Sequence, residues 1–349
     1  EITSDSQRFL NRFKCDSICS FHTHMIPPKL KKGDEVRVVA PGLSLSIISD
    51  EQRKIAEKNF AELGLLLSFG KHAEEIDDLS SSSIKSRVSD IHDAFSDVNV
   101  KGILSVIGGS NSNQLLGYLD WKIIKNNPKV FCGFSDVTIL NNAILTKTDL
   151  VTYSGPHYSS FTQKKYLDYT MDYFRKCLMD KKPYFVRPSS QWSDDKWYID
   201  QEKRNLILND GFLNICNGNT EGQIIGGNLC TFNLLQCTEY FPKLENAILF
   251  LEDDQESKPQ TFDRDLTSLS QQEGFDKVKG IVIGRFQKGS SMTNDILKTI
   301  ISNNKMLKGI PIVANVDFGH TDPRTTFPIG GTAKLLIGNK NCDIKILSH

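Results

Sequence analysis

Three polar residues that lie far apart in the chain could together perform the chemistry of a serine hydrolase. Ser112 follows the glycines of "ILSVIGGSNSN", Glu252 closes the apolar run "AILFLE", and His320 follows the glycine of "VDFGH". A serine hydroxyl becomes a strong nucleophile when a histidine takes its proton and a carboxylate orients the imidazole. Each residue lies at or just beyond the end of an apolar run that is typical of a buried strand, so the three could meet at one site.

The glycine-flanked serine admits more than one interpretation. Glycines let the backbone turn sharply, and the free amides at the start of a helix can stabilise an oxyanion. In this interpretation Ser112 attacks a carbonyl carbon, and the amides of Asn113 and of Gly109 hold the oxygen. Ser112 could instead cap the helix, or the loop could bind a phosphate. Ser110, two residues earlier, is the residue most easily mistaken for the nucleophile.

The acid and the base also have ordinary alternatives. Glu252 begins a run of acidic residues, "EDDQE", which is also typical of a solvated loop. His320 is distinguished among seven histidines by the apolar run and the glycine before it, and His157 in "YSGPHYSSF" is its main rival. A lone histidine is more often structural than catalytic.

The composition excludes several classes of protein. The chain has 349 residues, with 42 lysines and arginines balanced by 42 aspartates and glutamates, so no overall field attracts nucleic acid or an anionic membrane. No window approaches the roughly 20 apolar residues of a membrane span. Eight scattered cysteines predict reduced thiols in a reducing compartment, so a cytoplasmic protein is expected. No cofactor is expected.

The first residues stand apart from the rest. Residues 1–24 are polar, lack the pattern of a secretory signal, and are expected to be an extension. They contain a possible zinc-binding group, although its spacing fits none of the usual ligand pairs, so no metal is expected. The group consists of Cys15, Cys19, His22 and His24.

The elements that must position these residues predict an α/β fold. Apolar runs at 36–40, 65–69, 102–107 and 130–133 alternate with amphipathic helices, which indicates a doubly wound parallel sheet. After about residue 165 the runs become shorter and turns more frequent. We therefore expect an N-terminal parallel-sheet domain and a smaller, strand-rich C-terminal domain. The expected division is an extension at 1–24, domains at 25–165 and 191–349, and a linker at 166–190.

At the same stretches the sequence resembles the LD-carboxypeptidase family of serine peptidases, which includes an MccF-like branch of microcin immunity proteins. The resemblance extends from Met25 to the C-terminus and includes "SVIGGSNSNQLLGYLDW", "NPKVFCGFSDVTILNNAI", "LVTYSGPH", "GQIIGGNLCTFNLL", "ILFLEDDQES" and "DFGHTDPRTTFPIG". It implies a triad of Ser112, Glu252 and His320 in a groove between two domains, with no metal. It also implies a homodimer.

The resemblance implies two substrate classes. One is a muropeptide stem, from which an LD-carboxypeptidase removes the terminal D-alanine in peptidoglycan recycling. The other is a microcin-like peptidyl or aminoacyl nucleotide. By the same resemblance Trp192 or Trp197 would stack on a nucleotide base and Asn228 would contact substrate, although both indoles could instead pack the domain junction. Glu256 stands where the MccF pattern has a lysine. A carboxylate there repels phosphate and suits an ammonium group, so we expect a muropeptide substrate.

Two hypotheses from other functional classes remain open. A non-catalytic protein could keep the groove and bind a peptide or nucleotide without cutting it. A Rossmann-type enzyme could use "IGGSNSN" as a phosphate loop, although no G-x-G-x-x-G follows the first strand.

Overall fold

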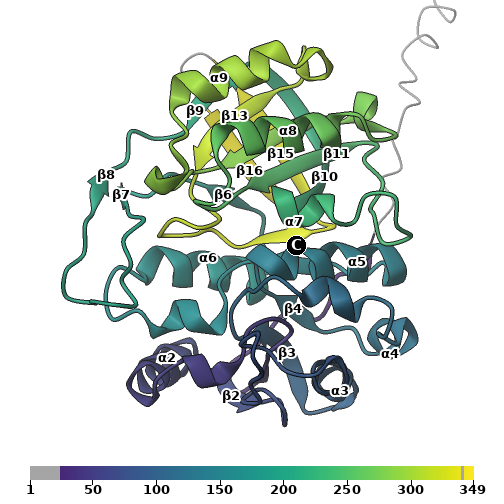
Figure 1. The fold of residues 1–349 in the computed structure, drawn as a ribbon, viewed down its shortest axis with the longest axis vertical. Helices are drawn as coiled ribbons and strands as arrows, with labels where there is room; N and C mark the ends of the chain where they lie inside the picture. Colours follow the sequence, from purple (N-terminus) through teal and green to yellow (C-terminus); the bar gives the residue numbers. More distant parts are fainter. Residues whose placement is uncertain (1–23, 339–341) are drawn as a thin grey trace, which may run out of the picture.

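The computed structural model describes residues 24–338 and 342–349. Cys15, Cys19 and His22 of the possible zinc group lie outside the described residues. Within them the chain forms two main sheets in separate halves of the molecule, with α5 and α6 between the halves (Figure 1). The α/β fold expected from the sequence is therefore present.

The first sheet is parallel except at one edge. Hydrophobic β-branched runs such as "EVRVV" form its central strands, as expected for a sheet covered by helices on both faces. Its six strands, in spatial order among the described residues, are β14 (Phe327–Ile329), β5 (Thr152–Ser154), β4 (Val130–Cys132), β3 (Val100–Ser105), β1 (Glu35–Val39) and β2 (Leu66–Phe69).

Helices connect these strands, and local signals fix their ends. Ser49 and Gln52 form a capping box at the start of α2, and Gly64 ends the helix with a φ of 75°. The helices of this half are α2 (Asp50–Leu63), α3 (Ile84–Ser96), α4 (Trp121–Asn126), α5 (Thr138–Thr148) and α6 (Asp168–Leu178), with the 3₁₀ turns η1 (Leu45–Ile47), η2 (Ser112–Leu115), η3 (Ser135–Val137) and η4 (Tyr158–Thr162).

The second sheet is mixed and has eight strands in the described part of the chain, two more than the first. Its centre, from β10 to β13, is parallel, and its edges are antiparallel. The spatial order is β6 (Tyr184–Val186), β16 (Cys342–Ser348), β15 (Thr332–Ile337), β10 (Gly218–Asn228), β11 (Ala247–Glu252), β12 (Gly280–Gly284), β13 (Ile312–Val316) and β9 (Leu213–Cys216).

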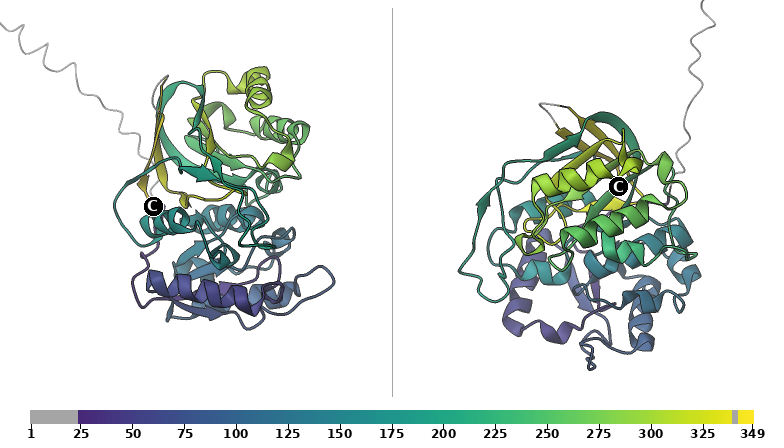
Figure 2. Two further views of the ribbon diagram at one scale, coloured as in Figure 1. Left: turned by 90° about the vertical axis from the view of Figure 1, so that its left-hand side faces the viewer. Right: turned by 45° about the horizontal axis from the view of Figure 1, so that its top comes forward.

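Short helices accompany this sheet, and a two-stranded hairpin projects beside it (Figure 2). The helices are α7 (Leu229–Asn233), α8 (Pro259–Ser270) and α9 (Asn294–Asn303), with the turns η5 (Phe275–Lys277), η6 (Lys288–Ser290) and η7 (Lys305–Leu307). The hairpin consists of β7 (Gln191–Trp192) and β8 (Ile207–Leu208).

Two strand pairings cut across the expected division of the chain. Strand β14 comes from the C-terminal half but pairs with β5, and β6 lies within the expected linker but pairs with β16. The proposed division into domains stays a prediction, and β14 ties the C-terminal half to the first sheet.

The end of β10 packs directly against α5. Asn142 of α5 exchanges side-chain hydrogen bonds with the backbone of Gly226, at 2.8 and 3.2 Å. A Cβ atom on Gly227 would stand 2.5 Å from Thr138 Oγ1, so only glycine permits this approach. The contact places the carboxyl ends of strands from both sheets next to one another.

Candidate functional site

His320 lies between a serine and a carboxylate. Its Nδ1 is 2.7 Å from Glu252 Oε2, and its Nε2 is 3.0 Å from Ser135 Oγ. The geometry assigns the ring proton to Nδ1, which donates to the carboxylate, and leaves Nε2 to accept from the serine hydroxyl. The sequence predicted that Glu252 and His320 lie together, but it did not predict Ser135 beside them.

Ser112 does not reach the histidine. It is fully buried, and its hydroxyl donates to Asp136 Oδ2 at 2.6 Å. The expected helix after it is only the four-residue 3₁₀ turn η2, which has no substantial dipole. Asn113 is exposed on that turn. Ser112 is therefore not the hydrogen-bond partner of His320 in this structure, because its hydroxyl proton is donated to Asp136 and the imidazole contacts Ser135 instead.

Ser135 occupies the sharp turn between β4 and the helical segment η3–α5. Its φ of 58° lies in the left-handed region, which a non-glycine residue rarely adopts. The same strained strand-to-helix turn exposes the serine of a nucleophile elbow. The sequence carries this signal in "VFCGFSD", where a buried strand runs into Gly133-Phe134-Ser135-Asp136, but Ser135 was not among the residues predicted to be catalytic.

Gly108 lies beside Ser135, and the next residue, Gly109, lies beside the Asp136 carboxylate. A Cβ atom on Gly108 would be 3.0 Å from Ser135 Oγ and 3.6 Å from the Asp136 amide nitrogen. Asp136 is the second residue of η3, so its amide lies in the first turn of a helical segment. The amides of Gly109 and Asp136 are therefore the candidates for an oxyanion hole beside Ser135, whereas the sequence predicted those of Gly109 and Asn113.

Glycines also enclose the acid. Glu252 ends β11, its side chain is 3% exposed, and a Cβ atom on Gly319 would come within 2.5 Å of Glu252 Oε2. Gly319 has a φ of 94°, so it both turns the chain and leaves room for the carboxylate. Glu252 and His320 are thereby held in contact.

The electrostatics of His320 follow from this contact. Burial by itself would lower the pKa of His320, but the charge of Glu252 and its hydrogen bond to the ring prevail and raise the pKa above the usual 6.5. The ionised pair stabilises the fold fully below pH 6.5, and this contribution is lost as the pH rises through the raised pKa.

A general base at this position must be neutral, so we predict a pH dependence. The value of kcat/KM is expected to fall as the pH drops through a pKa above 6.5, because protonated His320 cannot accept the serine proton. A pH profile of kcat/KM measures this acid limb. A limb below 6.5 would contradict the arrangement.

His157, the other histidine considered, supports the wall of the site. It is 2% exposed, and its Nε2 lies 2.9 Å from the carbonyl oxygen of Phe134. Its ring stacks on that of Phe134 at 4.1 Å between centroids. Burial lowers the pKa of His157 to about 3, so the imidazole stays neutral and packs behind Ser135.

The residues expected to bind substrate are distributed around this centre. Asn228 is 2% exposed, and its side chain caps α7 and donates to Asp253 Oδ1 at 3.2 Å, so it is already occupied. Glu256 is exposed in the turn after β11. Trp197 is half-buried, and its ring contacts that of Tyr198 at 5.9 Å.

The backbone next to Trp192 is joined to the segment that follows His320. The residue after it, Ser193, exchanges backbone hydrogen bonds of 2.7 and 2.8 Å with Asp322, two residues beyond His320. The Arg285 guanidinium lies 5.0 Å from the centre of the Trp192 ring, and the Lys288 ammonium lies 5.8 Å from it. A cavity of about 340 Å³ adjoins these three side chains.

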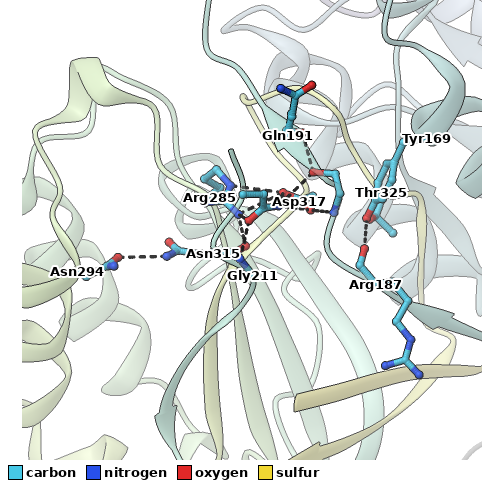
Figure 3. Close-up of polar contacts among 11 residues, drawn as sticks. Tyr169, Arg187, Gln191, Gly211, Arg285, Asn294, Asn315, Asp317 and Thr325 are labelled. Carbon is cyan, nitrogen blue, oxygen red and sulfur yellow. Dashed lines mark hydrogen bonds and ion pairs between the residues drawn. The ribbon is translucent and has the colours of Figure 1, made fainter. Parts of the chain in front are cut away.

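A buried polar network anchors the segment that carries Trp192, residues 187–211, which we term the tryptophan loop (Figure 3). Its centre is Asp317, which is fully buried and accepts from the Ser189 amide at 2.7 Å and from Arg285 at 3.4 Å. Asn209, near the other end of the loop, donates to Asp317 at 3.2 Å and accepts from Arg285 at 2.7 Å. One carboxylate thus holds both ends of the loop.

Removing this carboxylate should destabilise the protein. Asp317→Ala leaves the Arg285 side chain, 8% exposed, buried without its counterion, and we expect the free energy of unfolding to fall by about 3–5 kcal/mol. Urea unfolding followed by tryptophan fluorescence measures the change. The matched control is Asp343→Ala, whose partner Arg187 is 55% exposed, with an expected loss below about 1 kcal/mol. Equal losses in the two variants would contradict an anchoring role for Asp317.

Comparison with known proteins identifies the family. Residues 36–155 match the model of the LD-carboxypeptidase N-terminal domain, and residues 221–335 match that of the LD-carboxypeptidase C-terminal domain. YocD of Bacillus subtilis (strain 168), a candidate carboxypeptidase by its name, is 53% identical over 89% of this chain and 96% of its own. The microcin C7 self-immunity protein MccF of Escherichia coli is 33% identical over 80% of this chain and 84% of its own.

The similarity extends to three dimensions and confirms the fold class. The crystal structure of an MccF-like protein from Bacillus anthracis (strain Ames) superposes with a TM-score of 0.92 at 55% identity, covering 93% of this chain and all of the other (100%). The matching domains, relatives and structure show that the chain belongs to the LD-carboxypeptidase family of peptidases.

Proposed function

We propose that the chain is a serine carboxypeptidase that hydrolyses a peptide-like amide through Ser135, His320 and Glu252. The observation that carries the proposal is the imidazole of His320, 3.0 Å from the Ser135 hydroxyl on one side and 2.7 Å from the Glu252 carboxylate on the other. A hydroxyl, an imidazole and a carboxylate joined in this order are what nucleophilic acyl transfer requires.

The reaction follows from this geometry. His320 Nε2 takes the proton of Ser135 as Oγ attacks the carbonyl carbon, and Glu252 stabilises the imidazolium through Nδ1–H. The negative oxygen accepts from the Asp136 amide and from the Gly109 amide. His320 then gives its proton to the departing amine, and water, activated by the same imidazole, hydrolyses the acyl-enzyme.

The proposed substrate is a muropeptide stem that loses its terminal D-alanine. Glu256 is exposed four residues after the acid, where its charge suits the ammonium group of a diamino acid and repels a phosphate. One observation supports a second substrate class, an aminoacyl nucleotide. Trp192 lies beside two cationic side chains, and a solved MccF structure holds glutamyl sulfamoyl guanosine.

Product analysis tests the proposal. The protein is incubated with a tetrapeptide stem and, separately, with glutamyl sulfamoyl adenosine, and the products are identified by mass spectrometry. We expect D-alanine to be released from the tetrapeptide and the nucleotide compound to remain uncleaved. Glu256→Lys should slow that release and favour cleavage of the nucleotide, because the substitution reverses the local charge. Cleavage of neither compound, in protein that binds one of them, would favour the non-catalytic alternative.

We also propose a cytoplasmic location, a homodimer, and the absence of nucleic-acid and membrane partners, as expected from the sequence. In residues 24–338 and 342–349, none of the helices combines the length and the apolar character needed to span a bilayer.

A further inference from the structure

Asp136, which follows the proposed nucleophile, turns its carboxylate toward a neighbouring loop. The residue is 3% exposed. A single oxygen, Oδ2, accepts three hydrogen bonds, from the Ser112 hydroxyl at 2.6 Å, the Ser112 amide at 3.0 Å and the Asn111 amide at 3.2 Å. Hydrogen bonds to a charged, buried acceptor are among the strongest in proteins. Asp136 therefore fixes the position of residues 108–112, which we term the glycine loop.

The glycine loop forms one side of the proposed catalytic site. The carbonyl oxygen of Gly108 accepts from the Leu43 amide at 3.0 Å, and a Cβ atom on Gly42 would come within 2.5 Å of that oxygen. Across a planar trans peptide the carbonyl and the next amide point in opposite directions. The Gly109 N–H therefore points away from Leu43, and within the described residues no group accepts from it.

A buried arginine holds the far side of the same loop. Arg87 donates to Asn111 Oδ1 at 3.0 Å, to Gln114 Oε1 at 2.7 Å and to the carbonyl oxygen of Pro41 at 2.9 Å. Burial raises the pKa of Asp136, while the hydrogen bonds from Ser112 and Asn111 and the charge of Arg87 oppose the rise. The loop is thus fixed between a carboxylate and a guanidinium and has little freedom to adjust.

We propose that Asp136 is a positioning residue, whose carboxylate holds the glycine loop so that the Gly109 amide and its own amide both face the carbonyl oxygen attacked by Ser135. The inference rests on the proposed function, since it takes Ser135 as the nucleophile. It also assigns a role to Ser112, which donates the shortest of the three hydrogen bonds. Ser112, which the sequence predicted as the nucleophile, thus supports the site indirectly.

The test compares two buried aspartates that both accept from backbone amides. Asp136→Asn replaces one carboxylate oxygen by an NH₂ group and removes the negative charge. The Asn111 and Ser112 donors then lose a strong acceptor. We expect kcat to fall about 100-fold, as when an oxyanion donor is lost, with KM within about threefold of wild type. The control is Asp90→Asn, which removes an acceptor for the His72 amide at 3.0 Å and is expected to keep wild-type kcat. The acid limb of kcat/KM should not move in either variant.

A second readout follows the oxyanion directly. A peptidyl trifluoromethyl ketone forms a tetrahedral adduct with the serine and places an oxyanion in the site. Its affinity should fall with kcat in Asp136→Asn, while the affinity for the hydrolysed peptide product stays unchanged. Ser112→Ala, which keeps both backbone hydrogen bonds, should lower kcat by about tenfold.

The outcomes separate this inference from the proposed function. Full activity in Ser135→Ala would overturn the proposed function and this inference with it. A folded Asp136→Asn variant with kcat within about twofold of wild type, or with its whole loss in KM, would overturn the inference alone. If Asp136→Asn does not fold, the decision falls to Ser112→Ala, and an unchanged kcat in that variant would overturn the inference.

Discussion

Ser135→Ala is expected to lower kcat by about 10⁵-fold or more, because the variant lacks the only hydroxyl that His320 contacts in the described structure. Substrate should still bind, so KM should change little. The measurement is single-turnover hydrolysis of the tetrapeptide stem, combined with labelling by a fluorophosphonate. Wild type should be labelled at Ser135, and the variant should not be labelled.

Ser112→Ala is the matched control for this prediction. Both serines lie in short loops after neighbouring strands, but the Ser112 hydroxyl donates to Asp136 and is fully buried. Its loss should leave fluorophosphonate labelling at Ser135 intact and reduce kcat only about tenfold. A 10⁵-fold loss in Ser112→Ala together with an active Ser135→Ala would reverse the assignment.

Glu252→Gln is expected to lower kcat by about 10⁴-fold. A neutral amide can offer its NH₂ group to Nδ1 of His320, which favours the tautomer with the proton on Nε2, and such an imidazole cannot accept from Ser135. The variant also loses the charge that raises the pKa of His320. The acid limb of kcat/KM in the residual activity should therefore move to lower pH than in wild type.

Glu245→Gln controls for the chemical change itself. Glu245 is half exposed and pairs with Lys277 at the surface, so its substitution should leave both kcat and the pH profile unchanged. If Glu252→Gln kept kcat within about tenfold of wild type, Glu252 would not orient the imidazole. An unmoved acid limb would show that its charge does not set the pKa of His320.

Several of the buried strands and helices could be predicted from the sequence, because their signals are local. Runs such as "AILFLE" form strands that are buried along their whole length, whereas three-residue strands such as β5 and β14 were not predicted. Glu252 and His320 could be proposed as site residues for the same reason, since one ends such a strand and the other follows a glycine turn.

The nucleophile could not be chosen in this way. Both "SVIGGSNSN" and "VFCGFSD" are buried strands that run into a glycine and a serine, and both strands are neighbours in the first sheet. Ser135 and His320 come from different halves of the chain, and these halves also meet where Asn142 of α5 donates to Gly226 of β10. That contact joins residues 84 positions apart, and no local pattern records it.

The sequence by itself determined the fold class through local hydrophobic patterns and the family through the resemblance of its motifs. It also predicted Glu252 as the acid and His320 as the base, because strand ends and glycine turns are set by a few neighbouring residues. The tertiary structure alone decided that Ser135 meets the imidazole and that Ser112 supports Asp136. The physical reason is that a hydroxyl takes its role from the group it contacts, and here that group arrives from the other half of the chain.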